Sequence, residues 1–479
     1  MNVKLVFRIT GLALLLQAGA MLPPLLVCLR YGEDPAPFLW TIALLLLLGL
    51  PLTLLLRNDT RMYARDAYLA VGLIWLLFSL FGALPFYFSG RFGGFVDCLF
   101  EATSGFTTTG ATVLRAVEGL PMGQLFWRSF THWLGGMGVL ILTTALMPFL
   151  GISSNHLIRA ESPGPVKSKL VPRASNSSKI LYSIYLGLTL VQVVALRMVG
   201  MPWFDAVVNA FATAGTGGFS IRNTSIAAYH NPAAEVVLTV FMLLFSLNFA
   251  LYFLLLTGRV KQVLKSDELR FFLGVVGVST LAIAWNTASR FDSLWTTLRT
   301  AAFQVASIIS STGFATVDYD AWPQFSRLVL MMLMFIGSCA ASTGGGMKCS
   351  RILVLLRSAR REIATIVPPR SVSVVRLDGV PLSEEVLRTT HCYFFLYFLT
   401  VGAAALLVSF DNFSFGTTVT AVIACVSNIG PGLETVGPMG NFAPFSDLSK
   451  VVFSICMVIG RLEMFPIFVL FSRSSWKHT

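Results

Sequence analysis

The feature that most limits the fold of this chain is an irregular, glycine-containing segment that occurs four times between long apolar segments. Each occurrence places small polar residues before a glycine, and the glycines are Gly110, Gly218, Gly313 and Gly430. A lipid bilayer tolerates irregular backbone only where protein or a water-filled path surrounds it. Four such segments therefore indicate loops that meet around one axis. Rings of backbone carbonyls replace the hydration shell of an alkali cation, so the pattern predicts a cation pore.

The composition places the chain in a membrane. Of its 479 residues, 55% are hydrophobic and 12% are charged, about half the charged fraction of a soluble domain. The formal net charge of +12 is also compatible with a nucleic-acid partner, but the basic residues lie in short segments between apolar runs, as in membrane proteins. The seven cysteines are scattered and form no C-x-x-C pair. We expect a surrounding lipid bilayer, no nucleic acid and no disulfide framework.

Ten apolar segments are long enough to span a bilayer. They lie near residues 5–28, 38–56, 67–90, 125–150, 178–201, 233–257, 268–287, 323–356, 386–409 and 448–472. The last eight flank the glycine segments in pairs, which indicates four repeats of about 100 residues, each of the form helix, half-helix, loop, helix. The predicted units are the two N-terminal helices, 1–60, and the repeats 61–155, 156–260, 261–365 and 366–479.

The basic residues predict the orientation of the chain. Most of the 35 lie in six segments: the N-terminus, 57–66, 151–179, 258–270, 351–388 and the C-terminal tail. These segments fall on one side if all ten spans cross the bilayer, and the positive-inside rule makes that side the cytoplasm. Both termini are then cytoplasmic, and the glycine segments open from the outside.

Alignment on the four glycines shows the repeat at single positions. The residue six before each glycine is small, and these residues are Ser104, Ala212, Ser307 and Ala424. The residue two before carries a side-chain oxygen, and the residue nine before is Glu101, Asn209, Gln304 or Ala421. Asp97 and Asp205 lie thirteen residues before the first two glycines. They fit either the N-terminal charge of a half-helix or an outer attractor of cations.

The chemistry of cation binding explains why these residue types recur. A dehydrated cation needs several oxygen dipoles at fixed spacing, and glycine permits both the unusual dihedrals and the close approach of four backbones. A half-helix before each loop would direct its negative C-terminal end to the membrane centre. The predicted ion ligands are Thr108, Thr109, Gly110, Thr216, Gly217, Gly218, Ser311, Thr312, Gly313, Asn428, Ile429 and Gly430.

A family resemblance rests on these four motifs, which are Thr108–Thr112, Thr216–Ser220, Ser311–Phe314 and Asn428–Gly432. They resemble the selectivity filters of the Trk/Ktr/HKT superfamily of potassium transporters, and the whole chain is most similar to the TrkH-type branch. The resemblance implies an all-α polytopic membrane fold, with four M1–P–M2 repeats in pseudo-fourfold arrangement around a central ion pore, plus two N-terminal transmembrane helices. It also implies potassium (K+) as the transported ion. In this superfamily, glycine in all four filters goes with potassium and serine in the first with sodium.

Two further features of the sequence also resemble this superfamily. The small-residue run 337–346 interrupts an apolar segment and cannot be a robust helix. Arg461 lies inside the last apolar segment, where an unpaired charge is costly. By resemblance, an intramembrane loop and a pore arginine gate the pore, and the predicted gating residues are Gly344, Gly345, Gly346, Lys348 and Arg461. Without it, the run is a kinked helix packed through small residues, and Arg461 has a local partner such as Glu463.

Partners also follow from the resemblance. It implies a homodimer in the bacterial inner membrane, regulated by a cytoplasmic TrkA-type ring of nucleotide-binding subunits that docks on 151–179 and 351–388. No dinucleotide fingerprint occurs in the chain, so we expect no organic cofactor in it and no catalytic residue. Two alternatives stay open: a sodium-conducting or sodium-coupled member of the superfamily, and a polytopic membrane enzyme of lipid-linked substrates. The second would need clustered carboxylates or histidines, and no H-E-x-x-H or G-x-S-x-G motif is present.

Overall fold

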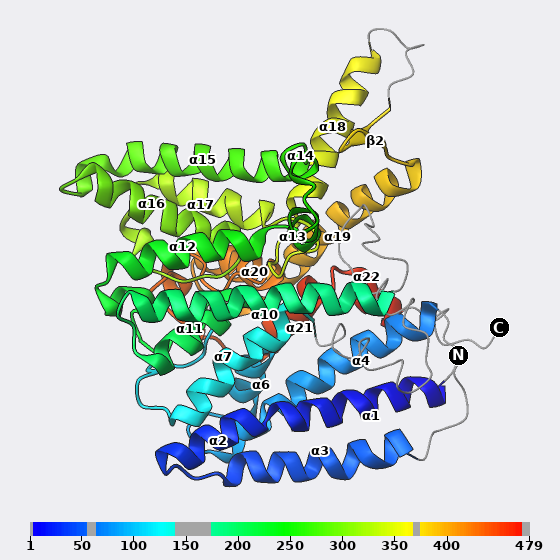
Figure 1. Cartoon of the computed structure of the whole chain (residues 1–479), viewed down its shortest axis with the longest axis vertical. Coiled ribbons are helices and arrows are strands. Elements are labelled where there is room, and N and C mark those ends of the chain that lie inside the picture. The colour runs from blue at the N-terminus through cyan, green and yellow to red at the C-terminus, as the bar shows by residue number, and fades with distance from the viewer. Residues whose placement is uncertain (1–2, 55–63, 139–173, 367–373, 472–479) are drawn as a thin grey trace.

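Figure 1 shows the computed structural model of the chain, which consists almost entirely of helices. The structure describes residues 3–54, 64–138, 174–366 and 374–471. Strands occur within these ranges only as a short antiparallel hairpin of β1 (Arg376–Leu377) and β2 (Val380–Pro381). Most of the predicted docking segment 151–179 and part of 351–388 lie outside the described residues.

Three helices precede the first repeat. Helices α1 (Val3–Ala20) and α2 (Leu22–Tyr31) follow one another as a single apolar stretch, and α3 (Ala36–Leu54) packs along α1. Gly11 and Gly49 allow close contact between α1 and α3, because a Cβ on Gly49 would lie 3.1 Å from the carbonyl oxygen of Gly11. Small residues at such crossings are typical of membrane helices.

Each repeat then supplies a long first helix, a short pore helix and a third helix. The first helices are α4 (Ala64–Gly82) with α5 (Leu84–Phe88), α10 (Ala174–Met198), α15 (Asp267–Thr287) and α19 (Glu384–Val408). The pore helices are α6 (Phe95–Phe106), α11 (Trp203–Ala214), α16 (Leu294–Ile309) and α20 (Phe415–Val426). The third helices are α7 (Met122–Gly136), α12 (Pro232–Ser246) with α13 (Phe249–Leu256), α17 (Gln324–Ile336) with α18 (Cys349–Ile366), and α21 (Asp447–Arg461) with α22 (Phe465–Phe471).

Short elements connect these helices. They are α14 (Val260–Leu264) and the 3-10 turns η2 (Ser225–Tyr229), η3 (Ala288–Arg290), η4 (Tyr319–Ala321), η5 (Ser409–Asp411) and η6 (Glu434–Val436). Glu434 caps pore helix α20 by accepting hydrogen bonds from the Thr417 amide at 3.1 Å and from the hydroxyls of Ser414 and Thr417. These hydrogen bonds, with that from Ser414 the strongest, hold the pKa of Glu434 below its ordinary value.

The third helices differ from the prediction of continuous spans. Within the described residues, six helices are long and apolar enough to cross a membrane, or seven if α12 and α13 count as one span bent by 93°. The interruption predicted at 337–346 is present between α17 and α18. Breaks after Ser246 and after Arg461 were not predicted, and the predicted span 125–150 is described only to residue 138.

The arrangement of the helices leaves the pore helices inside. In Figure 1 the long helices α1, α3, α10 and α15 lie in rows across the molecule, and α18 projects beyond them at one end. Burial agrees, since pore helix α16 has ten buried residues, whereas only 22% of the apolar stretch that begins at Asp267 in α15 is buried. The exposed apolar side chains of the first helices therefore face the lipid, and the glycine segments lie at the centre.

Candidate ion pathway

The four glycine segments form a closed ring, hereafter the filter ring, of residues 108–110, 216–218, 311–313 and 428–430. Each glycine lies against the carbonyl oxygen of the residue that precedes the next repeat's glycine. The contacts join Gly110 to Gly217, Gly218 to Thr312, Gly313 to Ile429 and Gly430 to Thr109. A Cβ added to the glycine would lie 1.7, 1.9, 2.2 and 2.7 Å, respectively, from the carbonyl oxygen, so only glycine fits at these positions. The fourth contact returns to the first repeat, so the segments surround one axis.

The backbone has the same conformation in all four segments. The φ angles of the glycines are 78°, 75°, 82° and 92°, and those of the residues two before them, Thr108, Thr216, Ser311 and Asn428, are 55°, 55°, 60° and 53°. Positive φ is uncommon for residues with a Cβ and rare for β-branched ones. The surrounding structure must therefore hold this strained conformation, as is typical of functional sites.

One hydrogen bond per repeat holds each turn. The amide of the residue before the glycine donates to the carbonyl of the small residue six before the glycine. The four bonds are Thr109 to Ser104 at 2.9 Å, Gly217 to Ala212 at 2.8 Å, Thr312 to Ser307 at 2.9 Å and Ile429 to Ala424 at 2.9 Å. Each pore helix thus ends directly at the filter ring, with its negative dipole end toward it.

Several polar side chains in the filter ring bond to one another. The hydroxyl of Thr109 lies 2.8 Å from that of Thr107, and the Asn428 amide group donates to Thr109 at 2.9 Å and to the Met457 carbonyl at 2.9 Å. These bonds connect the fourth segment to the first. The side chains of Thr109 and Asn428 therefore brace the ring between its fourth and first segments.

A cavity of about 90 Å³ lies on the side of the filter ring where the chain leaves the four glycines. It is lined by the four filter glycines, by residues of the segments that follow them and by Arg128 and Arg222, and no Asp or Glu occurs among these described lining residues. Asp97 instead pairs with Lys450 at 2.7 Å, and Asp205 accepts a hydrogen bond from the Tyr229 hydroxyl at 3.0 Å. Both aspartates lie in the first turns of pore helices, which favours the helix-charge interpretation over that of cation attractors.

An intramembrane loop, residues 337–348, lies against the opposite side of the filter ring. The amide of Gly345 donates to the Ser311 hydroxyl at 2.6 Å, and the amide of Gly346 donates to the Ser427 carbonyl at 2.9 Å. A Cβ on Gly344 would lie 2.7 Å from the carbonyl oxygen of Ser310. The loop therefore packs directly under the third and fourth segments, and glycine is needed for this close approach.

Comparison with known proteins identifies the family. The TrkH family model, described as cation transport protein, matches residues 37–478. The chain belongs to the TrkH family. It is 37% identical to the Trk system potassium uptake protein TrkH of Salmonella typhimurium over 100% of both chains, and 33% identical to TrkG of Escherichia coli over 99% of both. The crystal structure of the potassium transporter TrkH from Vibrio parahaemolyticus matches with a TM-score of 0.88 at 32% identity, over 100% of both chains.

Membership in the TrkH family confirms three predictions. The protein is an all-α membrane protein with several spans, it is a transporter, and it is not an enzyme. The alternative of a membrane enzyme acting on lipid-linked substrates is therefore wrong. The roles of single residues do not follow from family membership and are argued from the geometry of this chain.

Arg461 connects three parts of this TrkH-family structure. Its guanidinium donates to the carbonyl of Thr343 in the intramembrane loop at 2.7 Å, and to those of Gly135 and Gly136 at the end of α7 at 2.5 and 2.8 Å. Glu463, the local partner considered from the sequence, forms an ion pair with Arg351 on α18. The arginine thus joins the fourth repeat to the loop and to the first repeat.

Both ends of the intramembrane loop are also held. The buried carboxylate of Glu268 in α15 accepts hydrogen bonds from the amides of Ala340 at 2.6 Å and Ser350 at 3.1 Å. Lys348, a predicted gating residue, donates to the carbonyl of Gly344 within the loop. No role for Glu268 was predicted, because its only signal in the sequence is a carboxylate near the start of an apolar segment.

Two residues that received no role from the sequence lie beside the filter ring. His132 is buried, its Nδ1 lies 2.8 Å from the Gly105 carbonyl oxygen, and its ring packs on Phe219 with 4.2 Å between centroids. These contacts agree with a packing histidine. Arg128 is buried as well and pairs with Glu101, which is one of the residues nine before a filter glycine.

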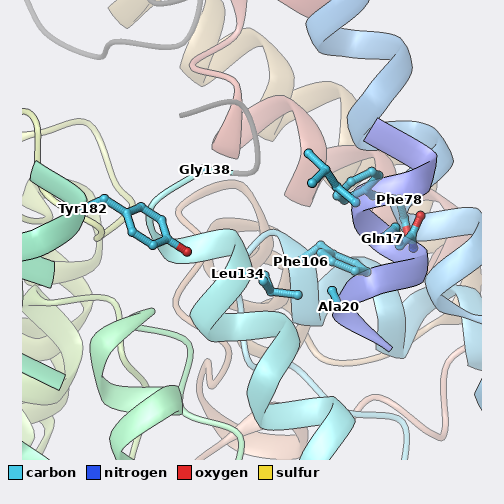
Figure 2. Close-up of a pocket in the computed structure, with 8 residues that line it drawn as sticks. Gln17, Ala20, Phe78, Phe106, Leu134, Gly138 and Tyr182 are labelled. Atoms are coloured by element: carbon cyan, nitrogen blue, oxygen red, sulfur yellow. The ribbon is translucent and has the colours of Figure 1, made fainter. Parts of the chain in front are cut away.

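A second cavity, of about 20 Å³, lies beside the first pore helix (Figure 2). Figure 2 shows Phe78 and Phe106 with Gln17 on one side, and Tyr182 on the other side of Leu134. The Gln17 side chain donates to the Phe78 carbonyl at 3.0 Å. The volume is enough for about one water molecule, and none of the described residues that line this cavity belongs to the filter ring.

Proposed function

We propose that the chain carries potassium ions into the bacterial cytoplasm through the filter ring. The closed ring of four glycines, each against the carbonyl of the next repeat, carries this proposal. Relatives that are named potassium uptake proteins and cover the whole chain support the choice of ion. The ion ligands are the carbonyls of residues 108–110, 216–218, 311–313 and 428–430, which replace water around a dehydrated K+.

The structure supports a closed gate on the inner side of the filter ring. The loop at 337–348 packs against the third and fourth segments, and Arg461 bonds to its Thr343 carbonyl. A positive charge next to the path raises the energy of a passing cation. Displacement of Gly344, Gly345 and Gly346 from the filter ring, with release of Arg461, would open the path. Lys348 holds the shape of the loop itself through its bond to Gly344.

Regulation is proposed to come from the cytoplasm. A homodimer in the inner membrane, with both termini inside, would present the basic helix α18 and the hairpin β1–β2 to a TrkA-type nucleotide-binding ring. Helix α18 carries Arg357, Arg360 and Arg361 and projects from the helix rows in Figure 1. The same helix begins directly after the intramembrane loop, so a partner bound to α18 can move the gate.

Ion flux into liposomes tests the proposal. Purified protein in proteoliposomes loaded with potassium should accumulate radioactive rubidium, and external potassium should inhibit that uptake far more strongly than external sodium. Equal inhibition by both ions would favour the sodium-conducting alternative and would contradict the proposed selectivity. Absence of uptake at all voltages, both by the folded, dimeric parent and by Arg461→Ala, which removes a contact of the proposed gate, would contradict transport through the filter ring.

A further inference from the structure

Two opposite charges are buried directly beside the filter ring. The side chain of Glu101, in pore helix α6, is 0% exposed and that of Arg128, in α7, is 2% exposed. The Arg128 Nε and Nη2 atoms lie 2.8 and 2.7 Å from the same Glu101 oxygen, Oε1. A buried pair does not by itself add stability, because desolvation offsets the attraction. The function of the pair therefore has to be judged from the contacts that it makes with other groups.

Glu101 holds the backbone that leaves the first filter glycine. Its carboxylate accepts hydrogen bonds from the Thr112 hydroxyl at 2.9 and 3.0 Å and from the Val113 amide at 3.1 Å. The Thr112 hydroxyl in turn accepts from the Leu114 amide at 3.1 Å. Thr112 and Val113 lie two and three residues after Gly110. The carboxylate thus connects the pore helix before the filter to the segment after it.

Arg128 holds the equivalent backbone of the second repeat. Its Nη1 donates to the carbonyl of Ser220 at 3.1 Å, and its guanidinium lies 4.1 Å from the centre of the Phe219 ring. Phe219 and Ser220 follow Gly218 directly. One ion pair therefore fixes the exits of two adjacent filter segments.

The other two repeats have neutral braces at the same place. Gln304 donates to the Thr316 hydroxyl at 3.2 Å in the third repeat, and the Thr420 hydroxyl accepts from the Leu433 amide at 3.0 Å in the fourth. In the second repeat, Asn209 donates instead to the Tyr229 hydroxyl at 3.1 Å. The exit of the second segment is the one that Arg128 holds across the repeat boundary.

We propose that Glu101 and Arg128 are positioning residues that set ion selectivity by holding the first two filter segments at the spacing that potassium requires. Charge-assisted hydrogen bonds are about twice as strong as neutral ones, and burial strengthens them further. The pair resists displacement of the carbonyls of Gly110 and Gly218, and a ring that relaxes accepts ions of other sizes. This inference rests on the proposed potassium transport.

The test compares variants of the full-length protein in planar bilayers. The potassium-over-sodium permeability ratio is taken from the reversal potential with potassium on one side and sodium on the other. Glu101→Gln and Arg128→Gln each remove charged hydrogen bonds of the brace, and each is expected to lower the ratio by about tenfold or more. Glu235→Gln is the matched control, because Glu235 pairs at 2.9 Å with Arg299 of pore helix α16, and it should keep the parental ratio.

A double variant separates positioning from simple charge balance. If the two charges only neutralise each other, Glu101→Gln with Arg128→Gln restores the parental ratio, and this result would overturn the inference. If they position the filter, the double variant is at least as unselective as either single variant. Thr112→Val keeps both charges and removes only the hydroxyl link, so it tests the inference even if the charge variants do not fold. Its expected result is a reduced ratio, and an unchanged ratio counts against the inference.

The permeability ratio of the parent protein separates failure of the proposed function from failure of the inference. A parent that does not prefer potassium over sodium contradicts the proposed function and, with it, the inference. A selective parent with equally selective Thr112→Val and double variants contradicts the inference alone.

Discussion

Replacement of Arg461 by alanine is expected to raise potassium flux in the absence of any regulatory partner. The side chain donates to three carbonyls, one on the intramembrane loop at Thr343 and two at the end of α7, at Gly135 and Gly136. Alanine removes all three bonds and the positive charge together. The loop then loses a restraint on its closed position, and the path loses a charge that opposes cations.

The size of the effect follows from the hydrogen bonds and the charge that are lost. Loss of one hydrogen bond from a charged donor, about 1.5–3 kcal/mol, raises the population of a displaced loop about 10- to 150-fold. The lost charge adds to this, since a unit charge about 4 Å from an ion contributes about 4 kcal/mol at an effective dielectric constant of about 20. Arg461 is partly exposed, so water reduces the second contribution, and we take the loop contact as the lower bound.

The assay is rubidium uptake into proteoliposomes by Arg461→Ala, Arg461→Lys and the parent, each at the same protein content. Lysine keeps the charge, but its single ammonium group cannot reach both the Thr343 carbonyl and the α7 carbonyls as the guanidinium does. Arg461→Lys should therefore give a smaller rise than Arg461→Ala. If Arg461→Ala folds, inserts and forms the parental oligomer yet conducts no faster than the parent, Arg461 is not part of the gate. The run 337–346 is then better explained as a helix-packing segment.

Four other predictions concern the filter ring, the loop, the topology and acid stability. Gly110→Ser should admit sodium, seen as a lower rubidium-over-sodium flux ratio, because a Cβ there would lie 1.7 Å from a neighbouring carbonyl oxygen at a φ of 78°; an unchanged ratio would contradict the ring. Glu268→Gln should raise basal rubidium flux severalfold, because an amide satisfies the two loop amides more weakly than a carboxylate; parental flux would show that this anchor is not limiting. Single cysteines at the exposed positions Arg115 and Ile363, in a cysteine-free background, should react with an impermeant reagent from outside and from inside respectively, and labelling from the same side would contradict the topology. Glu434→Gln should lower the melting temperature above the ordinary carboxyl pKa and make it fall less on acidification. The lowered pKa of Glu434 stabilises the fold above the ordinary pKa, and this stabilisation is lost as the pH falls through the lowered value. Identical pH profiles of the melting temperature in variant and parent would contradict this.

The filter ring was predictable because its determinants are local and repeated. Each turn needs a glycine with positive φ and a small residue six positions before it, and both lie within one short segment. Four copies of a weak pattern make a strong one. The bonds from Thr109 to Ser104 and from Gly217 to Ala212 have nearly the same length, since the same local chemistry produces the same turn.

The breaks in the third helices were predictable only where the sequence interrupts its own helical propensity. Seven of the residues in 337–346 are Gly, Ser or Thr, and such a run weakens a helix. The break after Ser246 has no such run, since Leu247 and Asn248 interrupt an otherwise apolar segment. One tertiary contact stabilises it, because the Ser246 carbonyl accepts from the Cys339 amide at 3.0 Å, and Asn248 caps α13 locally. A contact between two repeats cannot be read from either one alone.

The roles of the charged residues Glu101 and Arg128 could not be predicted from the repeats. A repeat alignment finds what all four units share, and Glu101 has a charge where its equivalents are Asn209, Gln304 and Ala421. Its partner Arg128 bonds to Ser220, which is 92 residues away in another repeat. A single chain with four unequal repeats can adjust each side of its pore separately, which four identical subunits cannot do. The residues that differ among the repeats are therefore the positions where selectivity can be adjusted without loss of the ring. The Glu101–Arg128 pair in the first repeat, with neutral hydrogen bonds at Gln304 and Thr420 in the third and fourth repeats, is such an adjustment.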